Sequence, residues 1–139
     1  MAAERFMLDT NIASDIIKGP TKSLKARLTR SALGDIAISA ITEAELLRGV
    51  ARKPDATRLS LAVREFLLRV DILPWDSQAA AAYAHLRTAI ERDGKALGTM
   101  DMLIAAHSVA VDAVLVSRDK AFFQLKRHLK LADWSKRAK

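Results

Sequence analysis

The stretch "RFMLDTNIAS", residues 5–14, joins a short apolar run to the polar residues Asp9, Thr10 and Asn11. An apolar run bounded by turn-forming residues is typical of a buried β-strand. Asp, Thr and Asn are also common caps, because their side chains accept hydrogen bonds from the free amides of a following helix. A carboxylate at the end of a buried strand can equally bind a metal ion. The stretch therefore predicts a strand followed by a helix, with Asp9 acting as a cap or as a ligand.

Strands and helices are expected to alternate along the rest of the chain. Further strands are expected in "DIAIS" (35–39), "VDILPW" (70–75), "AVLVS" (113–117) and "LKLADW" (129–134). Helices are expected over residues 12–18, 21–33 with Gly34 as the cap, 41–50 ending near Gly49, from Pro54 to about 70, 76–93, 99–111 and 119–125. Apolar strands separated by helices indicate a parallel sheet covered on both faces. The sequence thus predicts an α/β fold in a single domain over residues 1–139.

The composition limits the kinds of protein that this chain can be. The chain has no cysteine, which excludes disulfides and thiolate zinc sites. We expect no signal peptide, because no long apolar segment follows a basic start, and no membrane span, because the most apolar tract falls short of about 20 uninterrupted residues. We therefore expect a cytoplasmic protein. The net charge of +7, from 23 basic and 16 acidic residues, favours a polyanionic partner, and nucleic acid is the leading candidate.

Four acidic residues follow strands or begin helices. Asp9 ends the first strand, Glu45 lies in the helix after the second, and Asp101 and Asp119 lie on either side of the fourth. In parallel sheets the functional crevice forms at the carboxyl ends of the strands. We therefore expect these four carboxylates to meet at one edge of the sheet.

Each acid also has a purely structural explanation. Thr42 and Glu45 have the spacing of a capping box, and Asp101 and Asp119 suit helix starts, where negative charge offsets the macrodipole. Four acids at one edge, however, would repel one another and raise one another's pKa values unless cations neutralised them. Oxygen ligands without cysteine suit Mg²⁺ or Mn²⁺. An acidic, metal-binding notch in a basic chain is the chemistry of a nuclease.

Other kinds of site find less support. The histidines His85, His107 and His128 show no metal-ligand spacing and are interpreted as structural or surface residues. No glycine-rich phosphate-binding loop is present in the sequence.

Four segments carry a family resemblance: "FMLDTN" (6–11), "ISAITEAELLRG" (38–49), "DGKALGTMDMLIAAHS" (93–108) and "LVSRDKAF" (115–122). In this order they resemble PIN-domain proteins, and more narrowly the VapC toxins of bacterial toxin–antitoxin pairs. The resemblance implies a parallel sheet of about five strands in the order 3-2-1-4-5. It also implies an endoribonuclease that cleaves tRNA or ribosomal RNA through Mg²⁺ or Mn²⁺ held by Asp9, Glu45, Asp101 and Asp119.

The resemblance also implies supporting residues and partners. Thr10, Asn11 and Ser117 match polar positions that support the acids, and Asp76 matches a helix cap. The implied partners are a VapB-type antitoxin and a second copy of the chain. Two alternatives stay open: a catalytically silent PIN fold that binds RNA or a protein, and a DNA-directed nuclease of the same fold.

Overall fold

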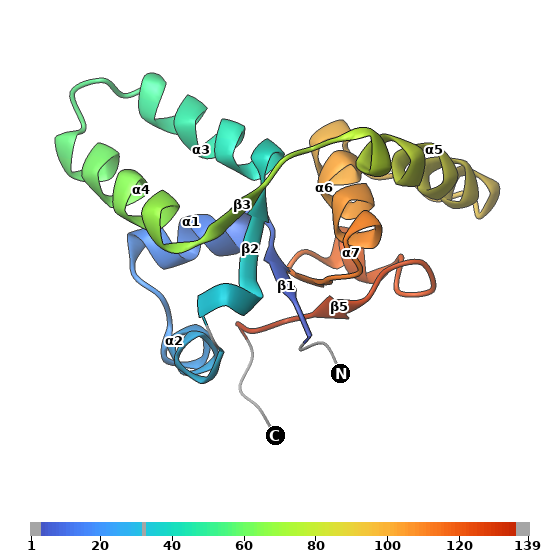
Figure 1. The fold of residues 1–139 in the computed structure, drawn as a ribbon, viewed down its shortest axis with the longest axis horizontal. Helices are drawn as coiled ribbons and strands as arrows, with labels where there is room; N and C mark the ends of the chain where they lie inside the picture. Colours follow the sequence, from blue (N-terminus) through green and yellow to red (C-terminus); the bar gives the residue numbers. More distant parts are fainter. Residues whose placement is uncertain (1–3, 32, 136–139) are drawn as a thin grey trace.

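A five-stranded parallel sheet forms the centre of the computed structural model, which describes residues 4–31 and 33–135 (Figure 1). The strands lie in the order β3-β2-β1-β4-β5. Their bounds are β1 Phe6–Leu8, β2 Ile36–Ser39, β3 Asp71–Leu73, β4 Val114–Val116 and β5 Leu131–Ala132. The predicted α/β class and the strand order 3-2-1-4-5 are confirmed.

Helices cover both faces of this sheet. Their bounds are α1 Thr10–Lys18, α2 Lys22–Arg30, α3 Ala40–Ala51, α4 Thr57–Arg69, α5 Ser77–Arg92, α6 Thr99–Ala110 and α7 Lys120–Phe123, with a 3₁₀ turn over Leu33–Asp35. Figure 1 shows α1 to α4 on one side of the sheet and α5 to α7 on the other. Among the described residues, no helix is long and apolar enough to cross a membrane.

Alternating side chains of the strands supply two apolar cores. Met7 packs with Leu115 into the core beneath α5, α6 and α7, whereas the next residue, Leu8, packs with Ile38 into the core beneath α1 to α4. All four side chains are fully buried, and burial of each one stabilises the fold by about 1.5–3 kcal/mol. Because β1 is held from both faces, the position of the residue that follows it, Asp9, is fixed.

Two predicted helix boundaries are wrong, and a third is displaced by two residues. Gly34 does not cap α2: the cap is Ser31, whose N–H donates to carbonyls of the last turn, and Gly34 lies in the 3₁₀ turn. Helix α3 continues past Gly49 to Ala51, since one glycine costs a helix only about 1 kcal/mol. Helix α4 begins at Thr57 and not at Pro54, because residues 53–56 form a turn closed by the Ala56 N–H and the Lys53 carbonyl.

Candidate active site

Asp9 follows β1 and begins α1, so it is both the helix cap and the centre of the acidic edge. Its Oδ1 accepts the Ile12 backbone N–H at 2.8 Å, and its own backbone N–H donates to the Val116 carbonyl at 3.0 Å. The residue is 2 % exposed. The cap fixes one carboxylate oxygen toward α1 and leaves Oδ2 for other partners.

Burial raises the pKa of Asp9 from 3.8 to about 6. The negative charge of Asp101 also raises it, while hydrogen bonds from Ser117 and Ile12 and the positive charge of Arg118 oppose the rise. Burial exceeds these compensating interactions because the ionised carboxylate loses most of its hydration. Burial therefore opposes the ionised form of Asp9, and a bound cation would favour it.

Ser117 links two of the acids. It is fully buried directly after β4, and its side chain hydrogen-bonds Asp9. Its Oγ also accepts the backbone N–H of Asp119 at 3.0 Å. Asp119 in turn caps α7, with Oδ1 accepting the Ala121 N–H at 2.9 Å. One hydroxyl thus joins the end of β1 to the acid that follows β4.

Glu45 reaches the same edge from α3. The Thr10 hydroxyl donates to Glu45 Oε1 at 2.5 Å and lies 3.2 Å from the Thr42 hydroxyl. The capping-box interpretation of Thr42 and Glu45 is wrong, because α3 begins at Ala40 and its cap is Ser39, whose Oγ accepts the Ile41 N–H. Glu45 lies inside the helix, where it caps nothing and faces α1.

Asp101 connects the four acids electrostatically. It lies half-buried in the first turn of α6. Its pKa is raised first by burial, then by the negative charges of Asp119 and Glu45, and its own charge acts on Asp9. The structure therefore brings all four predicted acids into one electrostatic cluster at the carboxyl ends of β1, β2 and β4.

The donor set fits a hydrated divalent cation. All four groups are carboxylates. Besides burial, the charge of Asp101 raises the pKa of Asp9, and the charges of Asp119 and Glu45 raise the pKa of Asp101, a repulsion that a bound cation would offset. Across residues 4–31 and 33–135, no three acidic or histidine side chains converge into a ready-made cage. Mg²⁺ keeps several waters and needs only one or two protein carboxylates, so an open arrangement suits it better than Ca²⁺ or Zn²⁺.

A cleft of 360 Å³ opens beside this cluster between α1, α3 and α4. Thr10 and Glu45 line it together with cationic side chains, namely Lys18, Arg52 and Lys53. A second hollow of 350 Å³ on the other side of α3 is lined by Arg48, Arg52 and Met100. Asn11 is exposed on the wall of the first cleft, and no hydrogen bond from it to a site acid occurs among the described residues.

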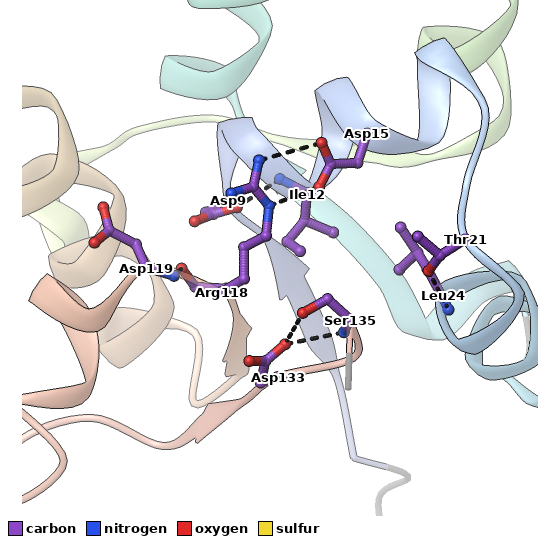
Figure 2. Close-up of polar contacts among 10 residues, drawn as sticks. Asp9, Ile12, Asp15, Thr21, Leu24, Arg118, Asp119, Asp133 and Ser135 are labelled. Atoms are coloured by element: carbon purple, nitrogen blue, oxygen red, sulfur yellow. Dashed lines mark hydrogen bonds and ion pairs between the residues drawn. The ribbon is translucent and has the colours of Figure 1, made fainter. Parts of the chain in front are cut away.

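The sequence interpretation missed an ion pair at this edge. Arg118, between Ser117 and Asp119, donates from Nε to Asp15 Oδ2 at 2.8 Å and from Nη2 to Asp15 Oδ1 at 3.3 Å. Figure 2 shows Arg118 reaching toward α1, where Asp15 lies. The adjacency of Arg118 to Asp119 was the available signal, but nothing local indicates its partner 103 positions away.

The histidines have structural environments, as expected. His107 is buried, with Nδ1 2.7 Å from the Ser39 hydroxyl, and burial lowers its pKa. His128 pairs with Asp93 at 2.7 Å, and His85 is exposed on α5. His107 therefore ties α6 to the residue that caps α3.

Comparisons with known proteins agree with this geometry. Residues 6–128 match the family model described as PIN domain. The chain is 34 % identical to a protein of Shigella flexneri named tRNA(fMet)-specific endonuclease VapC, over 94 % of this chain and 98 % of that one. It is 34 % identical, with the same coverage, to Ribonuclease VapC2 of Rickettsia felis.

Solved structures show the same arrangement. A DNA-bound VapBC complex from Salmonella typhimurium contains a chain similar to this one, with a TM-score of 0.86, 29 % identity, and coverage of 95 % of this chain and 99 % of that chain. VapBC2 of Rickettsia felis, bound to a DNA fragment from its promoter, gives a TM-score of 0.82 at 32 % identity, covering 93 % and 98 %.

Proposed function

The chain belongs to the PIN-domain family and, within it, to the VapC ribonucleases, and from that premise we propose that its four-acid edge hydrolyses RNA with the help of Mg²⁺ or Mn²⁺. It is the toxin of a VapBC-type pair, and a VapB-type antitoxin is its partner. The proposal on the metal rests on one observation: the charges of Glu45 and Asp119 act on Asp101, and the charge of Asp101 acts on Asp9. A bound cation would offset this repulsion.

Each acid has a distinct part in the proposed reaction. Asp9, fixed by the Ile12 amide and the Ser117 hydroxyl, would be the central ligand. Glu45 and Asp101 would complete the first ion's ligands. Asp119 would hold a second ion or orient the attacking water. When bound, the cation supplies positive charge that stabilises the entering and leaving oxygens of a phosphodiester.

Neighbouring residues influence the orientation and the protonation of these acids. Thr10 donates to Glu45 Oε1, which fixes that carboxylate as an acceptor facing α1. Ser117 favours the ionised form of Asp9, while burial opposes it, so Asp9 must release its proton before it can hold a cation. Water is then added across a P–O bond of the RNA backbone. We expect a 5′-phosphate and a 3′-hydroxyl as products.

The substrate proposed for the first test is tRNA, with ribosomal RNA as the second. The Shigella flexneri relative is named for tRNA(fMet), the initiator tRNA. The basic side chains along the cleft, Lys18, Arg52 and Lys53, suit the phosphates of an RNA strand that leads to the acids. We also propose a homodimer and a cytoplasmic location.

Cleavage of total tRNA and ribosomal RNA, with and without Mg²⁺, tests the proposal. The full-length protein, freed of co-purified antitoxin, is compared with Asp9→Asn. Asp112→Asn is the matched control, because Asp112 is exposed in the turn before β4, at the opposite end of that strand from Ser117. We expect Mg²⁺-dependent cleavage by the wild type and the control only.

Two results would contradict the proposal. Equal cleavage by wild type and Asp9→Asn would show that Asp9 is not needed for the reaction. Activity that persists in excess EDTA would show that the reaction needs no divalent cation. RNA binding without cleavage would favour the silent binding module, and cleavage confined to DNA would favour the DNA-directed nuclease.

A further inference from the structure

Arg118 is a cation placed among the acids of the candidate site. It directly follows the buried Ser117 and precedes Asp119, and 47 % of its side chain is exposed. Its guanidinium group makes a two-point ion pair with Asp15, which lies on α1 six residues after Asp9. Figure 2 shows this pair beside Asp9, with Asp119 at the base of the same side chain. The pair therefore bridges the end of β4 and α1 at the acidic edge.

The choice of partner is informative, because three acids compete for Arg118. The charges of Asp9 and Asp119 both act on it, yet among the described residues its ion pair is with Asp15. An arginine bound directly to Asp9 or Asp119 would occupy the oxygens that a cation needs. In the part of the chain that the structure describes, the guanidinium hydrogen bonds go to Asp15, so the pair keeps Arg118 next to the site without a hydrogen bond to those oxygens.

The pair retains binding capacity for a phosphate. A guanidinium group has five N–H donors, and Asp15 accepts two of them. Because the Asp15 charge offsets that of Arg118, the pair opposes cation binding less than a free arginine would. The remaining donors can still bind phosphate oxygens, for which the planar guanidinium is well suited.

Stability gives a weak reason for this pair. Its side chains are 47 % and 33 % exposed, and exposed ion pairs contribute little to the free energy of unfolding. A role in folding would also not require the pair to lie beside the site acids.

We propose that Arg118 binds a phosphate of the RNA strand at the cleavage site and that Asp15 positions its guanidinium group for this contact. The proposal rests on the function proposed above and adds a substrate-binding residue and a positioning residue to it. It predicts that the two residues act as one unit.

The test replaces Arg118 by Met, which keeps the apolar stem and removes every N–H donor. Arg87→Met is the matched control, since Arg87 is also 47 % exposed and also pairs with an acid, Glu91, but lies on α5. Initiator-tRNA transcript is bound to full-length protein carrying Asp9→Asn, which prevents turnover, over a series of KCl concentrations. Cleavage is measured in the same variants with Asp9 intact.

We expect Arg118→Met to lower the slope of log affinity against log salt by about 0.7–0.9, the change for one lost phosphate contact. We expect kcat/KM to fall by about 10- to 100-fold, as for loss of a hydrogen bond to a charged group. Arg87→Met should change neither. Arg118→Lys should restore the salt slope but not the full rate, because a point charge cannot make the two-point contact.

Asp15→Asn tests the positioning role. Alone it should lower kcat/KM less than Arg118→Met does, and in the Arg118→Met background it should cause no further loss. An additive loss in the double variant would overturn the positioning role. The thermal unfolding midpoint, measured alongside, should stay within a few degrees in all these variants, as for any exposed pair.

The proposal would be overturned if Arg118→Met and Arg87→Met gave the same salt slope. It would also be overturned if the lower kcat/KM of Arg118→Met were fully explained by a lower thermal unfolding midpoint of that variant. Failure of the proposed function is distinguishable from this. If the wild type cleaved no RNA, the salt slope would still decide whether Arg118 binds phosphate, and an absence of tRNA binding would reject the contact outright.

Discussion

Asp9→Asn should make the metal-free protein more stable at neutral pH, although it removes the central acid of the site. The pKa of Asp9 is about 6 in the folded protein against an ordinary 3.8. At about 1.4 kcal/mol per pH unit, ionising Asp9 costs the folded state about 3 kcal/mol. Asn caps a helix about as well as Asp, so the substitution keeps the Ile12 contact while removing that cost.

The sign follows from proton linkage. Because burial raises the pKa of this acid, its protonated form favours folding at low pH, and that stabilisation is lost as the pH rises through about 6. The stability gained by Asp9→Asn should therefore be small at pH 4. It should grow with pH and approach its upper limit of about 3 kcal/mol above pH 7.

Urea unfolding in EDTA at pH 4, 5, 6, 7 and 8 measures this difference. Asp112→Asn is the control, because its carboxylate is exposed and lies at the opposite end of β4 from Ser117. Mg²⁺ at one thousand times the dissociation constant should then reverse the order, because it would stabilise the wild type by about 4.1 kcal/mol and the variant much less. A difference that stays constant from pH 4 to 8 would refute the buried, proton-linked carboxylate.

Three further predictions concern the supports of the site. Thr10→Val should remove the 2.5 Å hydrogen bond to Glu45 and lower kcat/KM for RNA cleavage by about tenfold. Thr10→Ser should keep the hydrogen bond and the wild-type kcat/KM, and cleavage kinetics of the two variants measure the difference. Burial lowers the pKa of His107, so protonating it disfavours the fold, and the wild type should lose stability as the pH falls below 6.5. His107→Leu should make this loss smaller. Urea unfolding at pH 5 and 7 tests the prediction, and an equal loss of unfolding free energy in the variant and the wild type would contradict it. Trp134→Ala should lower the free energy of unfolding by about 3–5 kcal/mol, since the indole is buried against Phe6, and a loss under 1 kcal/mol would show that β5 does not depend on it.

The strand pattern and one topological rule predict most of the site. Apolar runs in "FML" and "VLV" are too short for helices and lie between helical segments, so a parallel sheet is the consistent solution. Carboxyl ends of such strands meet at one edge, which brings Asp9 near Asp119 without knowledge of any side-chain position. The clustering of the acids thus follows from chain direction.

Details set by competing local interactions could not be predicted in the same way. Thr42 and Glu45 match a capping box, but Ser39 at the end of β2 caps the helix first, so the true boundary depends on where the strand stops. The pairing of Arg118 with Asp15 depends on the choice among three nearby acids, which only the packed side chains determine. Sequence spacing carries no information on such a choice.

The two interpretations of Asp9, cap and ligand, are therefore not exclusive. As a cap it needs only an acceptor for the Ile12 amide, and Asn or Ser would supply one without a buried charge. The Ser117 hydroxyl and the Arg118 charge favour the ionised form but leave its pKa near 6, so the fold opposes the charge that this residue carries. Capping alone leaves that cost unexplained, whereas a bound cation would offset it, because ionised Asp9 and its neighbours Asp101 and Asp119 would then share a counter-charge.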